Sequence, residues 1–314
     1  MDLNDVIRII LIFCACGIVF VLPSTIYTAM FWGVFYRRKP LLLDKDDLSK
    51  SSYAPFADEL KKTITEAKQI EHQTVNIKSN DGLNLVGRYF DKKSDTTLIL
   101  IHGYQSNSYN NFSGLLQYYL SLGYNVLMVD QRAHGSSAGR FTTAGCKEQY
   151  DLLNWISWVD AHSDCENIFI YGISMGATTI GLASDKIKNP KVKGLIMEAG
   201  FLSFYEEPVF SAGKVFMKKA AFNYVVLCAK HLLKADIKKT AADSLKNTSI
   251  PVLFLHGDSD KDVPIAHTQA NFDACASEKT FITVKGAGHT LCHLIGKETV
   301  EAALEGFISK HKAK

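Results

Sequence analysis

One serine in the sequence stands between two glycines, directly after a short apolar run. Residues 167–176 read NIFIYGISMG, so Gly172, Ser174 and Gly176 form the pattern Gly-x-Ser-x-Gly. Where a strand turns sharply into a helix, this pattern holds the serine oxygen above the sheet edge, and the glycines let strand and helix approach closely. The pattern alone often occurs by chance. The residues around it must therefore decide whether Ser174 is a nucleophile or an ordinary turn residue.

A serine hydroxyl is a weak nucleophile at neutral pH and needs a base that a third group orients. Two downstream segments contain residue types suited to these roles. The stretch HGDSDKDVP contributes Asp258, Asp260 and Asp262, and the stretch KGAGH contributes His289. Both segments follow apolar runs that predict strands, and chemistry in such sheets is found at strand ends. The order serine, aspartate, histidine is the one that this kind of nucleophile turn requires.

The elements that must position these residues alternate along the chain. Apolar runs closed by turn residues predict eight strands, and stretches with helical spacing separate them. The strands lie within 73–90 (two strands around a turn at 80–82), 96–104, 125–130, 167–174, 192–200, 250–257 and 279–286. The helices lie at 112–122, 142–162, 174–185, 266–276 and from 290 to the end. This alternation predicts an α/β fold, with a mostly parallel sheet covered by helices on both faces.

With these elements in place, the sequence resembles the α/β-hydrolase superfamily, specifically its bacterial membrane-anchored serine hydrolases and esterases, which include serine aminopeptidase-like members. The resemblance covers roughly residues 71–310 and rests on LILIHGY, VDQRAHGSSAG, GISMGA, PVLFLHGDSDKDVP and GAGH. It implies Asp260 as the acid, the fifth residue of H-G-x-x-D-x-x-V. Asp258 is the second choice, and Glu198 is a lesser alternative because some relatives carry the acid there. Asp262 is interpreted as a solvated loop carboxylate.

The same resemblance implies an oxyanion hole made of main-chain amides. The amide of Tyr104, which follows the His-Gly pair at 102–103, and that of Met175, directly after Ser174, would hold the oxyanion. The glycine-rich HGGG form is absent from this position. Its absence argues against the specialised lipases of that branch and leaves the hydrolytic mechanism unaffected.

The interval 201–246 interrupts the alternation of strands and helices. It is aromatic and helix-prone, and it is too long for a simple connection, so it predicts a small helical cap over a pocket. Phe201, Phe204 and Tyr205 would line an apolar acyl site there, although simple packing also explains such aromatics. Glu206 and Glu207 in the same interval would either hold the free amine of a peptide substrate or lie on the surface.

The amino-terminal segment predicts a membrane anchor. Residues 9–35 contain no charge, and as a helix they would span roughly 40 Å, more than the roughly 30 Å of a bilayer core. The start is acidic rather than basic and no clear cleavage site follows, which argues against a signal peptide. Arg37, Arg38 and Lys39 follow the run, so the positive-inside rule favours a cytoplasmic hydrolase domain. Seven cysteines without a CxxC pair agree with a reducing compartment.

The chain therefore divides into an anchor (1–38), a linker with a short amphipathic helix (39–70) and an α/β-hydrolase domain (71–314). The expected function is a serine hydrolase that cleaves carboxylic esters through an acyl-enzyme. A serine aminopeptidase-type peptidase and a non-catalytic, membrane-bound binding module remain as alternatives.

The sequence gives little support for nucleic-acid binding, cofactor binding or metal binding. The net charge of +3 and the lack of a basic stripe argue against nucleic-acid binding. Neither a dinucleotide fingerprint nor a P-loop is present, so no cofactor is expected. His289 and His293 lie four residues apart without a third ligand, which argues against a metal. His102, His134 and His256 are expected to make local hydrogen bonds. The expected partners are a small ester or acyl substrate and the membrane.

Overall fold

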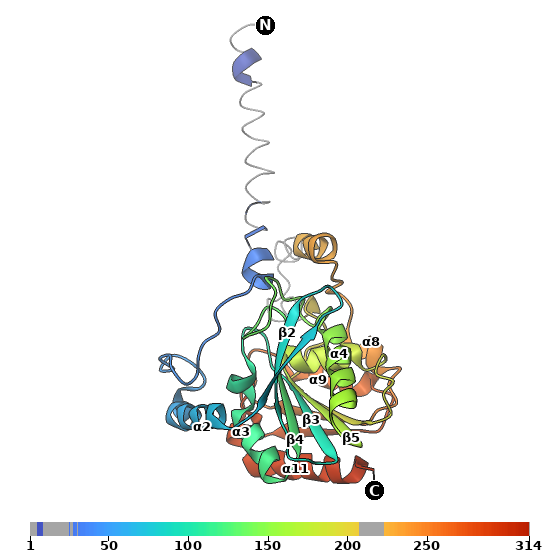
Figure 1. Ribbon diagram of the computed structural model, residues 1–314. Coiled ribbons are helices and arrows are strands. Elements are labelled where there is room, and N and C mark those ends of the chain that lie inside the picture. Colours follow the sequence, from blue (N-terminus) through green and yellow to red (C-terminus); the bar gives the residue numbers. More distant parts are fainter. Residues whose placement is uncertain (1–4, 9–24, 26–27, 30, 207–222, 314) are drawn as a thin grey trace.

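In the computed structural model, one eight-stranded sheet runs through the molecule (Figure 1). The structure describes residues 5–8, 25, 28–29, 31–206 and 223–313. The strand order is β1-β2-β4-β3-β5-β6-β7-β8, in which β2 is antiparallel to both neighbours and all other pairs are parallel. The strands are β1 (Gln73–Lys78), β2 (Asn84–Phe90), β3 (Thr96–Ile101), β4 (Asn125–Asp130), β5 (Asn167–Ile173), β6 (Val192–Glu198), β7 (Val252–Gly257) and β8 (Lys279–Val284). The expected mostly parallel sheet of eight strands is confirmed.

Helices cover both faces of this sheet (Figure 1). The helices are η1 (Ala54–Phe56), α2 (Ala57–Gln69), α3 (Ser108–Ser121), α4 (Glu148–His162), α5 (Met175–Ala183), η2 (Ala229–Leu233), α8 (Ala241–Leu245), α9 (Ile265–Ala274), α10 (Cys292–Ile295) and α11 (Lys297–His311). Side chains of α4, α5 and α8 pack on one face of the sheet, and those of α2, α3 and α11 pack on the other.

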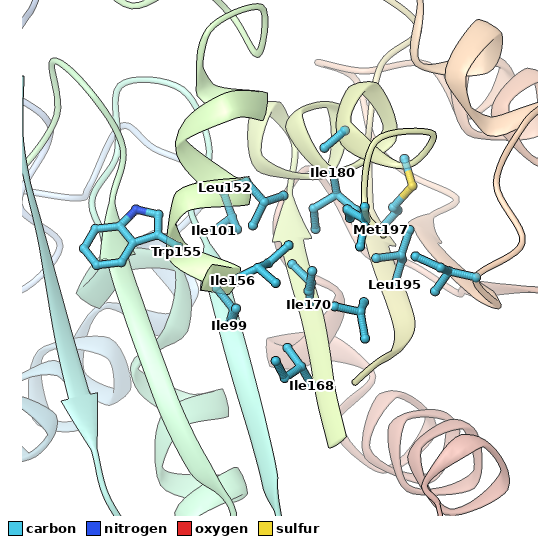
Figure 2. Packing of buried hydrophobic residues seen from close by; sticks show 14 of the residues in the cluster. Ile99, Ile101, Leu152, Trp155, Ile156, Ile168, Ile170, Ile180, Leu195 and Met197 are labelled. Atoms are coloured by element: carbon cyan, nitrogen blue, oxygen red, sulfur yellow. The ribbon is translucent and has the colours of Figure 1, made fainter. Parts of the chain in front are cut away.

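The central strands are buried on both sides, which explains their continuous apolar runs. In β3, Ile99 and Ile101 belong to one buried cluster, whereas Leu98 and Leu100 belong to the other. Figure 2 shows the first cluster, where Trp155 and other α4 side chains lie over isoleucines of the central strands. Full burial of one such side chain is worth about 1.5–3 kcal/mol. The two buried clusters, one on each face of the sheet, fix the positions of the strand ends. The candidate site lies at these strand ends.

Two predicted helices differ from the observed ones for local reasons. The helix expected from residue 142 begins only at Glu148, because the buried Glu148 carboxylate accepts hydrogen bonds from the amides of Thr143 and Gly145 and holds that stretch as a loop. The helix expected from residue 290 is divided into α10 and α11 at Gly296. The backbone of Gly296 has φ −115° and ψ 43°, outside the α-helical region, and this ends the first piece.

The short helix before the linker packs on the α/β domain. Residues 31–35 are helical, and Phe31 and Phe35 are buried in a cluster with Ala144, Val225 and Ala229. The expected span at 9–35 falls largely on residues 9–24, 26–27 and 30, which lie outside the described ranges. In the part that is described, no helix has both the length and the apolar character needed to cross a bilayer.

The interval 201–246, expected to form the cap, is described at 201–206 and 223–246. Its last helix, α8, does not belong to a cap, because Ala241 and Leu245 are buried in the cluster on the α4 and α5 face of the sheet. Described residues between 225 and 237, including those of η2, pack instead around Phe31 and Phe35. Glu207 lies outside the described residues.

Candidate active site

Ser174 sits in the turn between β5 and α5. Its backbone has φ 55° and ψ −117°, a left-handed conformation that costs a non-glycine residue about 1–3 kcal/mol. Both glycines of the motif are required by close approach. A Cβ on Gly176 would lie 2.0 Å from the Ile101 carbonyl oxygen, and one on Gly172 would lie 2.4 Å from the carbonyl carbon of Gly176. The strained turn between β5 and α5 thus fits the arrangement that the sequence predicts.

The three residues expected to act together are brought into hydrogen-bond contact. His289 Nε2 lies 3.0 Å from Ser174 Oγ, and His289 Nδ1 lies 2.7 Å from Asp260 Oδ2. Because an ionised carboxylate can only accept, Nδ1 carries the proton and donates it to Asp260. Nε2 is then the acceptor for the serine hydroxyl. This arrangement can remove the serine proton as the oxygen attacks a carbonyl carbon.

Asp260 is held in place from the side opposite His289. Its Oδ1 accepts hydrogen bonds from the amides of Asp262 and Val263, each at 2.9 Å, and its side chain is 1% exposed. His256 Nε2 donates to the Val263 carbonyl oxygen at 3.0 Å and also lies 3.4 Å from Asp260 Oδ2. The carboxylate is therefore fixed in the orientation that faces His289.

The electrostatics of the pair favour a charged aspartate beside a basic imidazole. Burial alone would raise the pKa of Asp260, but the hydrogen bond and charge of His289 outweigh it, so the pKa is lowered. Burial alone would lower the pKa of His289, but the hydrogen bond and charge of Asp260 outweigh it, so that pKa is raised. A more basic imidazole is a better acceptor for the serine proton.

The alternative acids occupy other positions. Asp258 Oδ1 accepts from the Gly286 amide at 2.7 Å and braces that turn. Glu198 Oε2 accepts from the Tyr171 hydroxyl at 2.5 Å, and burial raises the pKa of Glu198, which favours its neutral form. The Asp262 side chain is exposed, as expected of a solvated loop carboxylate. Of the four carboxylates, Asp260 is the one bonded to His289.

The amides expected to form the oxyanion hole flank the serine pocket. The amides on either side of Tyr104 already form hydrogen bonds. The Gly103 amide donates to Asn111 Oδ1 at 2.8 Å, and the Gln105 amide donates to His134 Nε2 at 3.1 Å. Within the described ranges, no hydrogen bond is formed by the amide of Tyr104 or by that of Met175 at the start of α5. Both can donate to an incoming oxyanion.

A cavity of about 200 Å³ opens onto Ser174 and His289. Its walls include Tyr104 and three residues that the sequence analysis assigned to the linker: Leu41, Leu43 and Tyr53. Tyr53 also shares a hydrogen bond of 2.6 Å with Thr290, next to His289. Three consecutive leucines at 41–43, within a charged stretch, indicate that this segment packs against another part of the protein. The sequence does not show which part that is.

The three aromatic residues expected at the acyl site lie beside this cavity rather than in its wall. Phe201 is buried with Met175 and Val263. The ring of Phe204 lies 6.1 Å from that of Tyr104 and 5.5 Å from that of Phe35. Tyr205 packs farther along the chain, with the Lys238 ammonium 4.7 Å from its ring centre. Of these three aromatic residues, Phe204 therefore contacts both Tyr104 and the helix at residues 31–35.

The remaining histidines make the local contacts expected of them. His102 accepts from the Gln131 amide at 3.0 Å, His134 accepts from that of Gln105, and His256 bonds Thr268 and Val263. His293 pairs with Glu301 at 3.0 Å. Across the described residues, no group of three histidine, cysteine or acidic side chains is placed to hold a metal ion.

Comparison with known proteins identifies two families along the chain. The sequence model of the X-Pro dipeptidyl-peptidase (S15) family matches residues 40–249, which include Tyr104 and Ser174. A model of TAP-like proteins matches residues 214–314, which include Asp260 and His289. The two matches together span the whole candidate site.

Individual relatives are more distant. An uncharacterized protein of Bacillus subtilis, YqkD, is 24% identical over 77% of this chain and 80% of its own length. Lysophosphatidylserine lipase ABHD12 of Rattus norvegicus is 27% identical over 51% of this chain, and the match spans only 40% of that lipase. Among solved structures, the esterase Pf2001 of Pyrococcus furiosus has a TM-score of 0.65 at 21% identity, covering 79% of this chain and 96% of the esterase. This structural likeness shows a shared α/β-hydrolase fold.

Proposed function

The chain belongs to the X-Pro dipeptidyl-peptidase (S15) family of hydrolases with the α/β-hydrolase fold, and from that premise we propose that it is a serine hydrolase of carboxylic esters. Ser174 is the nucleophile, His289 the general base and Asp260 the acid that orients the imidazole. The observation that carries the proposal is the continuous set of hydrogen bonds from Asp260 through His289 to Ser174, at the wall of a cavity.

The proposed reaction has two halves. In the first, His289 Nε2 takes the proton of Ser174 as Oγ bonds to the acyl carbon, and the amides of Tyr104 and Met175 hold the resulting oxyanion. The intermediate collapses, the alcohol leaves with the proton from His289, and an acyl-enzyme remains. In the second half, water loses a proton to His289 and attacks the acyl carbon. The acid is released, and the proton returns to Ser174.

An ester substrate fits the cavity better than a peptide with a free amino terminus. A peptidase of the aminopeptidase type needs a group that holds the substrate amine, and the described residues around this cavity include no carboxylate other than the buried acid itself. Glu206, one of the two candidates, lies outside the cavity wall. The similar rat protein is named a lipase, which also favours ester chemistry.

Parallel assays separate the three functional classes. We expect p-nitrophenyl esters to be hydrolysed and aminoacyl and X-Pro anilides to be cleaved at least about a hundredfold more slowly, since a site without an amine partner gains nothing from the free amine. Anilide cleavage faster than ester cleavage would instead identify a peptidase. Absence of both activities, together with no reaction with a fluorophosphonate, would identify a binding module.

Phe204 is expected to set the preferred acyl length. The Phe204→Ala variant should lower kcat/KM for an octanoyl ester by about tenfold or more and change an acetyl ester little. The Phe204 ring packs against Tyr104, which lines the cavity at Ser174, and apolar pockets discriminate by about 1–3 kcal/mol per methylene. Tyr205→Ala is the matched control, since this neighbouring ring packs near Lys238 instead. The measurement is kcat/KM across p-nitrophenyl esters of increasing length. Equal losses at every length would assign Phe204 to packing alone.

We also propose that the uncharged segment before Phe31 anchors the hydrolase to a membrane, with the hydrolase domain on the cytoplasmic side. Phe31 and Phe35 pack on the hydrolase domain, so the span is confined to residues 9–30, which as a helix still reach about 33 Å. The full chain should stay in membranes through an alkaline carbonate wash, and protease added to intact cells should spare it. Release by carbonate contradicts the anchor, and digestion in intact cells contradicts the orientation.

A further inference from the structure

A second cavity, of about 670 Å³, lies beside the candidate active site and is strongly basic. It is bounded by the segment after the amino-terminal helix, the start of α3 and the loop after β4. Five basic side chains line it, together with a single carboxylate, Asp130. The basic residues are Arg37, Arg38, Lys39, Lys68 and Arg88.

Two of these cations are neutralised within the protein. Arg88 pairs with Asp130 at 3.0 Å, and Lys68 pairs with Asp44 at 2.5 Å. Asp130 is saturated, because it also accepts hydrogen bonds from the amide and hydroxyl of Ser108 and from the amide of Ser136. The Asp130 carboxylate therefore does not neutralise the other cations of the cavity.

The other three cations, Arg37, Arg38 and Lys39, have no acidic partner. In the ranges that the structure describes, none of them takes part in an ion pair. Consecutive like charges at one cavity repel each other, and a surface of one sign attracts an oppositely charged ligand. The cavity therefore carries an excess of three positive charges.

The segment that carries these charges is held in a fixed position. The guanidinium of Arg37 donates to the carbonyl oxygen of Ser137 at 2.7 Å and to that of Gly135. The Arg37 amide donates to the Arg140 carbonyl oxygen, also at 2.7 Å. Carbonyl groups orient a guanidinium without cancelling its charge. The basic residues are therefore placed before any ligand arrives, which lowers the cost of binding one.

The basic cavity and the serine cavity share a wall. In the segment that follows Lys39, Leu41 and Leu43 line the cavity of Ser174, whereas Pro40 and Leu42 line the basic cavity. This segment therefore borders both cavities, which lie next to each other. The side-chain amide of Asn110 donates to the Leu41 carbonyl oxygen at 2.6 Å and holds the wall on α3.

We propose that the basic cavity binds the phosphate group of the substrate, so that the hydrolase acts preferentially on phosphorylated acyl esters. This inference rests on the proposed ester hydrolysis at Ser174. Arginine guanidinium groups match phosphate oxygens in paired, charge-assisted hydrogen bonds, and a phosphate monoester carries close to two negative charges. Ser136 and Tyr109 line the same cavity, and a hydroxyl group can donate a further hydrogen bond to phosphate. The ester group then lies in the adjoining cavity, at Ser174.

The test compares two butanoyl esters, one of glycerol and one of glycerol 3-phosphate, using the full chain in non-ionic detergent. Wild type should have kcat/KM at least about tenfold higher for the phosphorylated ester. The double variant Arg38→Gln/Lys39→Gln should lower the ratio of the two kcat/KM values by roughly tenfold, as expected when two exposed charge contacts are lost. Both side chains are exposed, so the variant should fold. The control Lys61→Gln/Lys62→Gln, which removes two exposed charges from α2, should keep the ratio.

Three outcomes overturn the phosphate site. The first is a wild-type ratio near one, and the second is a ratio that the double variant leaves unchanged. The third is stimulation of glycerol-ester hydrolysis by micelles containing a dialkyl phosphate, lost in the double variant, because the phosphate would then belong to a bilayer lipid rather than to the substrate. Failure of both esters to react would contradict the proposed function itself. Normal hydrolysis of the glycerol ester with no phosphate preference would contradict the phosphate site alone.

Discussion

Replacing Ser174 with alanine is expected to lower kcat/KM for a p-nitrophenyl ester by roughly 10⁵- to 10⁶-fold, the loss typical when a triad nucleophile is removed. The variant cannot form the acyl-enzyme, and what remains is catalysis by the oxyanion amides and substrate binding. The fold should persist, because the hydroxyl makes one hydrogen bond, to His289, and alanine has the same Cβ as serine in the left-handed turn.

The control for this substitution is Ser259→Ala. Ser259 lies in the loop of Asp260 and is exposed, and its hydroxyl donates to the neighbouring carboxylate of Asp258 at 3.0 Å. Its activity and thermal midpoint should stay near those of wild type. Hydrolysis by Ser174→Ala within about tenfold of the wild-type rate would remove Ser174 from the mechanism, provided that circular dichroism shows an intact fold.

Asp260→Asn is expected to lower kcat by roughly 10⁴-fold, because the imidazole loses its orienting charge and can adopt the wrong tautomer. The introduced asparagine side chain would still fill the space beside the amides of Asp262 and Val263, so stability should change less than activity. Asp258→Asn is the matched control. Its carboxylate braces the Gly286 amide and does not contact His289, so its effect should be about tenfold or less. The reverse order of the two effects would identify Asp258 as the acid.

The pH profile gives a second readout of the same pair. The free enzyme needs neutral His289, so kcat/KM falls as the pH drops through the pKa of this residue. Since Asp260 raises that pKa above the usual value for histidine, the acid limb of wild type should lie at higher pH than that of an ordinary histidine. In Asp260→Asn, the limb of the residual activity should move to lower pH. A limb that stays in place would mean that another group titrates.

The sequence was sufficient to predict the residues at the strand ends. Ser174 and Asp260 each follow a buried strand, whereas His289 follows the partly exposed edge strand β8. Each position depends on a strand closed by a turn, which is a local pattern that can be read directly. The oxyanion-hole role of the Tyr104 and Met175 amides stays a prediction, and it depends on the main chain rather than on the side chains. In contrast, the start of α4 depends on the buried carboxylate of Glu148, and no periodicity signals such a contact.

The pocket walls could not be predicted, because they are made by segments distant in the sequence. Leu41, Leu43 and Tyr53 were assigned to a linker, yet they line the cavity at Ser174. Arg37 was interpreted only as a membrane flank, although its side chain binds the loop after β4. Both contacts depend on how the chain before residue 70 folds back onto the strand ends, which local composition does not determine.

Covalent labelling of the full chain with a fluorophosphonate, followed by peptide mapping with mass spectrometry, tests the role of Ser174 most directly. An activated serine reacts with this probe, whereas an ordinary turn serine does not. We expect one adduct per chain, located on Ser174, with labelling and ester hydrolysis lost together over time. An adduct on a different serine, or ester hydrolysis that continues with Ser174 fully labelled, would contradict the account.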